Sequence, residues 1–269
     1  MIDEEELNII VTDVFDLYGY DFNLYSKASL KRRLNRLFIM DKFPSFAEFR
    51  HKINSDPHYL NRFVEEITVN VTEMFRDPSF YKVLKNEILP SLGTHPFIRI
   101  WHAGCSTGEE VYSMAILLKE AGLLQKSLIY ATDLNPSVLV KARGGIFPLS
   151  QMQLYSENYI ATGGANDFSS YYTANYDRAI FNADLREKMI FSTHNLVSDA
   201  SFNEFHLILC RNVLIYFDQE LQEKVFKLFD SSLGKLAYLC LGSKETIRFS
   251  KIENNYVQHG KEKIWRKIK

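Results

Sequence analysis

The stretch that most constrains the fold is IRIWHAGCSTGEEVYSMA, which runs from Ile98 to Ala115. It begins with an apolar run typical of a buried strand, passes through a turn with Gly104 and Gly108, and ends in a helical pattern. Glycine lets the backbone bend sharply and lets a ligand come close, because it has no side chain. The start of the following helix presents unpaired N–H groups and a partial positive charge. The stretch therefore predicts a ligand-binding turn at the edge of a sheet.

From Phe97 onward, candidate strands alternate with candidate helices. Strands are predicted at residues 98–102, 128–132, 189–193, 205–210 and 236–241, and helices at 110–121, 136–143 and 219–233. This alternation is typical of an α/β fold with a mainly parallel, Rossmann-like sheet covered by helices. The rhythm breaks at residues 159–185, where a Gly-Gly pair precedes YYTANYDRAIF. Its two-residue alternation predicts a small inserted antiparallel β-subdomain.

The N-terminal part shows only helical spacing. Helices are predicted around residues 7–18, 27–40, 45–54 and 58–67. In the second, leucines form one stripe, and Arg32, Arg33 and Arg36 fall on another side. We therefore predict a helical N-terminal domain at residues 1–66, a linker at 67–90, and a sheet domain at 91–269 with the β insert at about 159–185.

Composition excludes several classes of protein. The formal charge of −1 argues against a generally nucleic-acid-binding protein, which would be basic. The acidic start MIDEEELNII is no signal peptide, and no apolar stretch is long enough to insert into a membrane. The three cysteines are far apart, and no spacing suggests a metal site. We expect a cytoplasmic protein.

The turn AGCSTGEE narrows the choice of ligand. It matches neither the GxGxxG dinucleotide pattern nor the GxxxxGK[ST] phosphate loop, and its two acids would repel a pyrophosphate. They would suit S-adenosylmethionine, which carries a sulfonium and an ammonium but no phosphate. Asp133, at the end of the second strand, could accept hydrogen bonds from ribose hydroxyls, or it could cap a helix together with Asn135. A dinucleotide site and a purely structural turn stay open as alternatives.

Other polar residues fall where strands end. Asn195 follows the third strand, and Arg211 and Asn212 follow the fourth, shortly before Tyr216. In open α/β sheets the ligand crevice lies outside the carboxyl ends of the strands. The polar linker residues Asn70, Thr72 and Arg76 lie between the helical and sheet segments. His102 and His194 are also near strand ends, where a lone histidine is more often a core residue than a base.

Five segments together resemble one known family. TVNVTEMFRD, WHAGCSTGEEVYSMA, ATDLN, KARGGIF and LCRNVLIYF are similar to segments of the CheR-type chemoreceptor glutamate methyltransferases, in the same order over nearly the whole chain. The resemblance implies a class I methyltransferase fold. It also implies S-adenosylmethionine as methyl donor, S-adenosylhomocysteine as product, and glutamate side chains of chemoreceptor cytoplasmic helices as acceptors. The biological role would be adaptation in chemotaxis.

The resemblance also implies roles for individual residues. Glu109, the first acid of the turn, is expected to contact the ligand, with Glu110 as the helix-start residue. Arg76, Arg211 and Tyr216 are expected to position the reactants, with no general base. The cofactor-binding set implied by the match is Asn70, Thr72, Arg76, Gly104, Glu109, Asp133, Asn195, Leu196, Arg211 and Asn212.

The chain departs from the family pattern at three places. Val111 replaces a proline, Met74 replaces the first phenylalanine of an FFR segment, and Lys244 replaces the histidine of a GHSE-like stretch. The first two changes remove no polar cofactor contact. The β insert corresponds to a subdomain that in some members docks a receptor tail peptide, but its motif is divergent here.

The acceptor side is less constrained by the sequence. The Arg32, Arg33 and Arg36 side chains could form an ordinary solvated face, or they could approach an acidic receptor bundle. We expect the protein to act as a monomer. An acceptor glutamate is already ionised at neutral pH, so the enzyme mainly has to position it. One arginine of Arg76 and Arg211 would hold the cofactor carboxylate, and the other would orient the acceptor. A silent S-adenosylmethionine sensor or scaffold, or a methyltransferase with another acceptor, are the competing functions.

Overall fold

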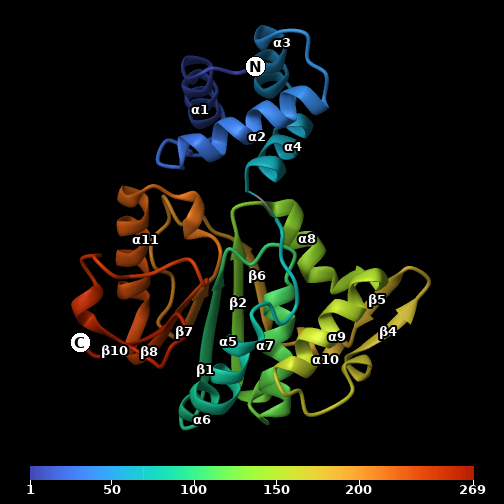
Figure 1. Cartoon of the computed structure of the whole chain (residues 1–269), viewed down its shortest axis with the longest axis vertical. Coiled ribbons are helices and arrows are strands. Elements are labelled where there is room, and N and C mark those ends of the chain that lie inside the picture. The colour runs from blue at the N-terminus through green and yellow to red at the C-terminus, as the bar shows by residue number, and fades with distance from the viewer. Residues whose placement is uncertain (69) are drawn as a thin grey trace.

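The computed structural model describes residues 1–68 and 70–269, and it divides into a helical bundle and a larger sheet domain (Figure 1). The bundle contains α1 (Glu4–Tyr18), α2 (Lys27–Met40), α3 (Phe46–Ser55) and α4 (Pro57–Thr68). Asp3 begins α1 with a reciprocal capping box with Glu6, which satisfies two free N–H groups. Each helix buries one apolar stripe, so the four predicted helices are confirmed.

The sheet domain has a seven-stranded sheet in the order β6-β2-β1-β7-β8-β10-β9. The strands are β1 (Ile98–Ala103), β2 (Ser127–Asp133), β6 (Met189–Thr193), β7 (Phe205–Cys210), β8 (Leu233–Leu241), β9 (Tyr256–Gln258) and β10 (Ile264–Lys267). The first five strands of that order pair in parallel, and β10 runs antiparallel to both its neighbours. The predicted mainly parallel α/β sheet is confirmed. The order reverses between β1 and β7, which places a ligand crevice at their carboxyl ends.

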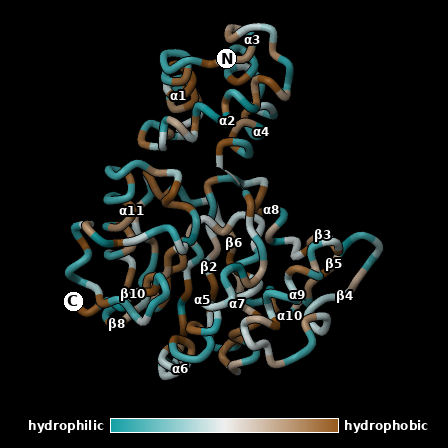
Figure 2. Tube along the Cα trace, in the orientation of Figure 1, coloured by the Kyte–Doolittle hydropathy of each residue, from teal (hydrophilic) through white to brown (hydrophobic). Residues whose placement is uncertain are grey.

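Helices cover both faces of this sheet. The side chains of Trp101 and Phe205 pack with α11 (Gln219–Ser232) on one face. On the other face, Ile100 and Leu209 pack with α7 (Glu109–Glu120) and with the helical run of α5 (Pro78–Val83), η1 (Leu84–Ile88) and α6 (Leu89–Leu92). The hydropathy trace shows apolar segments within the sheet domain and polar ones along its outer loops (Figure 2).

The remaining elements are short. α8 (Pro136–Gly144) follows β2, and short 3₁₀ turns lie at Leu124–Lys126, Leu149–Gln151, Phe168–Tyr171, Leu214–Tyr216 and Glu253–Asn255.

The predicted insert is a small antiparallel sheet in the order β3-β5-β4. Its strands are β3 (Ile146–Pro148), β4 (Tyr172–Asn175) and β5 (Arg178–Phe181), and its helices are α9 (Met152–Ala161) and α10 (Ala183–Arg186). The β4–β5 hairpin falls within the predicted residues, but the sheet begins earlier, at Ile146. A three-residue strand carries no recognisable alternation, so β3 could not be predicted. The domain limits at residues 66 and 90 stay a prediction, since α4 extends to Thr68.

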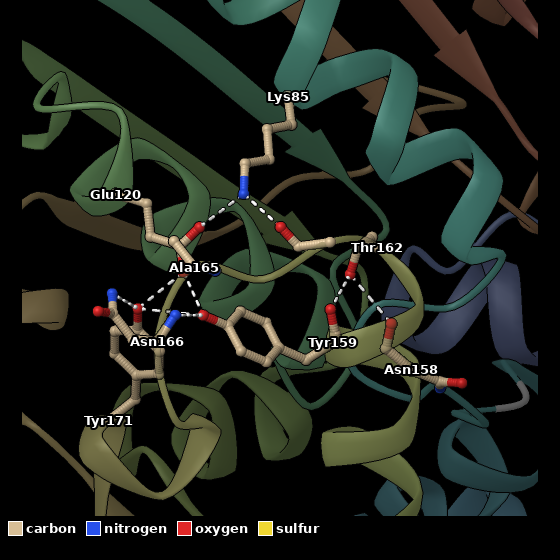
Figure 3. Close-up of polar contacts among 9 residues, drawn as sticks. Lys85, Glu120, Asn158, Tyr159, Thr162, Ala165, Asn166 and Tyr171 are labelled. Atoms are coloured by element: carbon tan, nitrogen blue, oxygen red, sulfur yellow. Dashed lines mark hydrogen bonds and ion pairs between the residues drawn. The ribbon is translucent and has the colours of Figure 1, made fainter.

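A buried carboxylate ties the insert to α7. Glu120 accepts hydrogen bonds from the hydroxyl of Tyr159, from the hydroxyl of Tyr171 (2.9 Å) and from the N–H of Ala165 (3.2 Å), and it pairs with Lys85 (Figure 3). Four donors on one carboxylate satisfy a group that would otherwise be costly to bury. This cluster fixes α9 firmly against α7.

α9 in turn supports the segment that joins the two domains. The Asn158 side-chain amide donates to the carbonyl of Met74 (3.0 Å), and the Tyr159 ring packs on Phe75 with centroids 5.2 Å apart. The linker around Arg76 is thus held by the insert from one side.

The helical bundle contacts the sheet domain through the start of α2. The N–H of Ser26 donates to the carbonyl of Tyr216 (2.9 Å), and the N–H of Asp218 donates to the carbonyl of Leu24 (2.9 Å). Between these bonds the rings of Tyr25 and Phe217 pack edge to face. These contacts bring α2 to the carboxyl end of the sheet.

Candidate functional site

A cavity of about 960 Å³, open to solvent, lies at the carboxyl ends of β1, β2 and β7 and beneath the linker. Clefts at the carboxyl ends of parallel strands are common sites for small-molecule ligands. Every site residue predicted from the sequence lines it except Glu109 and the three arginines of α2. The predicted residues on its wall are Asn70, Thr72, Arg76, Gly104, Asp133, Asn195, Leu196, Arg211, Asn212 and Tyr216.

The glycine turn approaches the cavity closely. Gly104 has φ +79°, and a Cβ added there would lie 2.5 Å from a methyl group of Val213. Only glycine fits this position without displacing the Val213 side chain. The N–H groups of Gly104 and Cys105 both donate to the carbonyl of Thr132, which joins the ends of β1 and β2.

Asp133 ends β2 on the cavity wall and is 8% exposed. Its carboxylate accepts hydrogen bonds from the N–H of Ser106 (2.8 Å) and from the N–H of Asn135 (3.0 Å). Burial raises the pKa of Asp133, although these backbone donors oppose the rise. Asn135 is the N-cap of α8, where its side chain accepts from the N–H of Ser137. The sequence left open whether Asp133 faces a ligand or caps a helix together with Asn135. In the structure Asn135 caps α8, and the Asp133 carboxylate lies on the cavity wall.

The two acids of the turn point the opposite way from the expectation. Glu110 lines the cavity, whereas the Glu109 side chain does not. Glu109 is buried with the Thr107 hydroxyl donating to it at 2.6 Å, and burial raises its pKa to about 7. Consecutive helix residues point about 100° apart, so only one of the pair can face the cavity. The structure therefore places Glu110, and not Glu109, on the cavity wall, contrary to the expectation for Glu109.

Glu110 is held by two partners. His102 Nδ1 lies 2.9 Å from Oε1, and the Arg211 guanidinium lies 3.1 Å from Oε2. Burial alone would raise the pKa of Glu110, but the His102 hydrogen bond and the Arg211 charge outweigh it, so the pKa lies below its ordinary value. The carboxylate is therefore ionised on the cavity wall at neutral pH.

Arg211 is occupied by contacts within the protein. Besides Glu110, its guanidinium donates to the Asp77 carboxylate (2.6 Å) and to the carbonyl of Arg76 (3.1 Å), and it stacks 4.1 Å from the Phe80 ring centroid. Its side chain is only 3% exposed. Arg211 thus joins α7, β7 and the linker.

Arg76 contrasts with this arrangement. Its side chain lines the cavity and makes no hydrogen bond or ion pair with any residue in 1–68 or 70–269. The flanking residues Phe75 and Asp77 both have positive φ, of 54° and 61°. Strained backbone of this kind concentrates at functional sites. Asp77 stands at the N-cap position of α5 but makes no capping bond, because its carboxylate pairs with Arg211.

The segment after β7 is supported from beneath by a carboxylate that the sequence analysis did not single out. Glu245 accepts from the N–H groups of Asn212 (3.0 Å), Ile215 (3.3 Å) and Gly242 (2.6 Å). It lies in the stretch where Lys244 departs from the family pattern, and the carboxylate contacts are present all the same. They fix Asn212, whose φ is 61°, at the cavity wall.

The three arginines of α2 have different environments. The Arg33 guanidinium lies 5.3 Å from the centroid of the Tyr216 ring and donates to the carbonyl of Glu66. Arg32 is exposed, and Arg36 is exposed beside Glu66, with 3.4 Å between the charged groups. Of the three arginines, only Arg33 is therefore shown in contact with a residue that lines the cavity, Tyr216.

The cavity wall carries polar groups without hydrogen-bond partners in the part of the chain that the structure describes, and its charged side chains have a net negative charge. Ser106 Oγ, Arg211 Nε and His194 Nδ1 are buried without a hydrogen-bond partner among the described residues. Charged lining residues are the acids Glu73, Glu110 and Asp133 and the bases Arg76 and Arg211, which leaves one net negative charge when all are ionised. The site therefore suits a polar ligand with net positive charge. Glu73, Ser106 and the bundle residue Tyr25 were not predicted, since only the packing of distant segments places them here.

Comparison with known proteins identifies the family. The family model described as the CheR methyltransferase SAM-binding domain matches residues 70–263, and the all-alpha CheR domain matches residues 5–68. The chain belongs to the CheR methyltransferase family. It is 43% identical to a Pseudomonas putida protein named "Putative methyltransferase Cher3", over 93% of this chain and 92% of that protein.

Two chemotaxis protein methyltransferases are also similar over most of their length. The chain is 32% identical to the one from Listeria innocua, over 85% of each chain. It is also 32% identical to the one from Borreliella burgdorferi, over 93% of this chain and 91% of that protein. The fold prediction and the predicted cofactor, S-adenosylmethionine, are both confirmed.

The cavity residues fit this cofactor. A donor with a sulfonium and an ammonium complements the net negative wall, and the unpartnered hydroxyl of Ser106 can bind one of its polar atoms. None of the helices in residues 1–68 and 70–269 is long and apolar enough to cross a membrane.

Proposed function

We propose that this CheR family member transfers a methyl group from S-adenosylmethionine to glutamate side chains of chemoreceptor cytoplasmic helices. The observation that carries the proposal is the pairing of a free cation with a fixed anion on one cavity wall. Arg76 has no partner in the described chain, and Glu110 is held ionised by His102 and Arg211. Such a pair suits the carboxylate and ammonium at the amino-acid end of the donor.

Each predicted residue has a role in this proposal. Asp133 would accept hydrogen bonds from the ribose, and Asn195 and Leu196 would border the adenine. Asn70 and Thr72 lie on the linker that covers the cavity. Arg211, which the sequence analysis placed at the cofactor or the acceptor, acts instead by holding the linker to α7. We therefore assign the cofactor carboxylate to Arg76.

The reaction needs orientation more than proton transfer. The sulfonium of the bound donor makes its methyl group electrophilic. An acceptor glutamate is ionised at neutral pH, so the protein does not need a base to activate it. Tyr216 lies on the cavity wall beneath Arg33, which fits a role in steering the acceptor towards the methyl group. Partial exclusion of water would favour a step in which opposite charges are neutralised.

The α2 face supports an acidic partner. Arg32 and Arg36 lie exposed on the helix that leads to the cavity through Arg33 and Tyr216. A receptor helical bundle that presents glutamates would be attracted to this face. We propose that the protein acts on it as a cytoplasmic monomer. Docking of a receptor tail peptide on the β insert is a weaker proposal, since the insert motif is divergent.

Turnover tests the proposal directly. The chain would be incubated with methyl-labelled S-adenosylmethionine and a receptor cytoplasmic fragment, and the labelled product treated with alkali. We expect label in the fragment that alkali releases as methanol, because methyl esters hydrolyse in base. A fragment with its methylation-site glutamates changed to alanine is the matched control. Base-stable label would indicate another acceptor, and binding of the donor without transfer to any receptor fragment would indicate a silent sensor.

A further inference from the structure

The buried imidazole of His102 contacts Glu110, a residue of the cavity wall, from outside the cavity. His102 is fully buried in β1, on the face that carries Ile100 towards α7, and its Nδ1 contacts Glu110 Oε1 at 2.9 Å. An ionised carboxylate can only accept a hydrogen bond, so Nδ1 carries the hydrogen in this contact. His102 is not part of the cavity lining, and its Nε2 has no partner among residues 1–68 and 70–269.

We infer that His102 is a positioning residue that fixes the Glu110 carboxylate for the ammonium group of the methyl donor. Oε1 is committed to His102 and Oε2 to Arg211. Each carboxylate oxygen can accept two hydrogen bonds, so one site on each remains for a ligand. The inference rests on the proposed function, because it assigns the amino-acid end of the donor to Glu110.

Packing alone does not account for a histidine at this position. A buried nitrogen without a partner is unfavourable, and a leucine would fill the same space without one. What the imidazole adds is one donor aimed at Glu110 from β1.

The position of Glu110 would change without this donor. Its long side chain has three rotatable bonds, and the remaining partner, Arg211, is bound at its other end to Asp77. The contact with Arg211 alone would draw the carboxylate towards the linker. His102 holds the other carboxylate oxygen, so that the two partners together define one orientation.

Three variants separate the hydrogen bond from packing. His102→Asn carries an amide nitrogen two bonds from Cβ, where Nδ1 lies, so it can keep donating to Glu110. His102→Gln carries its amide one bond further out, where Nε2 lies, and loses the contact while it stays polar. His102→Leu removes the donor and keeps an apolar side chain of similar length. The Asn and Gln pair decides the question even if the Leu variant is unstable.

Two ligands separate positioning from a general structural effect. S-adenosylhomocysteine has the amino-acid end, whereas 5′-methylthioadenosine has the same adenosine part without it. For the Gln and Leu variants we expect calorimetry to show about a tenfold loss of affinity for S-adenosylhomocysteine and less than a twofold change for methylthioadenosine. The Asn variant should stay within about threefold of the wild type for both ligands.

Several results would overturn the inference. Equal losses for both ligands would mean that His102 merely supports the sheet, and unchanged affinity of the Gln variant would mean that the contact has no role. If the wild type bound S-adenosylhomocysteine but the Asn and Gln variants were indistinguishable, only the positioning role would fall. If the wild type failed to bind it at all, the proposed function would fall as well.

Discussion

Replacing Glu109 by glutamine should stabilise the protein in a pH-dependent way. Glu109 is buried beside the Thr107 hydroxyl, and its pKa is raised to about 7 in the folded chain. In the unfolded chain a glutamate ionises near pH 4.3. Between these values unfolding releases a proton, so Glu109 lowers the stability of the fold as the pH rises, and the full cost is reached above pH 7. Glutamine does not titrate and can still accept the Thr107 hydrogen bond.

The size of the effect follows from the difference between the folded and unfolded pKa values of Glu109. A pKa difference of one between the two states corresponds to about 1.4 kcal/mol, so the free energy of unfolding of Glu109→Gln, relative to the wild type, should rise by about 2.5 kcal/mol between pH 5 and pH 8.5. Urea unfolding of both proteins at the two pH values measures this difference, and the other titrating groups cancel in it. If the difference in unfolding free energy between the variant and the wild type did not change with pH, Glu109 could not be a buried carboxyl that is protonated in the folded protein. Because Glu109 lies off the cavity, the variant should also bind S-adenosylhomocysteine like the wild type.

Three further predictions concern the arginines. Arg76→Met should weaken S-adenosylhomocysteine binding about 10- to 100-fold in calorimetry with little change in stability, whereas Arg178→Met on the exposed hairpin should leave both unchanged. Arg211→Met should instead lower the free energy of unfolding by about 3 kcal/mol or more, since it leaves Glu110 and Asp77 without their cation, and a stable variant would contradict this role. The double change Arg32→Glu and Arg36→Glu should slow methylation of a receptor fragment at low salt without altering cofactor affinity, and an unchanged rate would argue for a merely solvated face.

Features set by local sequence were predicted well. The bounds predicted for α2, residues 27–40, agree with the structure because a continuous leucine stripe defines the helix. The strands β6 and β7 were also placed at their observed bounds, since each is five or six residues long and contains an apolar stretch that can be recognised. β9 and β10 were missed because both are short and take their strand form from pairing with each other and with β8.

The site was predictable where strand ends define it. Asp133 and Arg211 fall at the carboxyl ends of strands in the sequence, and the parallel sheet brings them to one cavity. The orientation of single side chains was not predictable. Whether Glu109 or Glu110 faces the cavity depends on how α7 is rotated against the sheet, which the sequence does not encode locally. The position of Arg33 over Tyr216 likewise depends on how the two domains meet.

Calorimetric titration with S-adenosylhomocysteine tests the central claim most directly. If Glu110, Arg76 and Asp133 form the cofactor site, the wild type should show saturable binding of one molecule per chain, and Glu110→Gln should weaken it by about tenfold or more. No binding to the wild type, or equal binding to both proteins, would contradict the account.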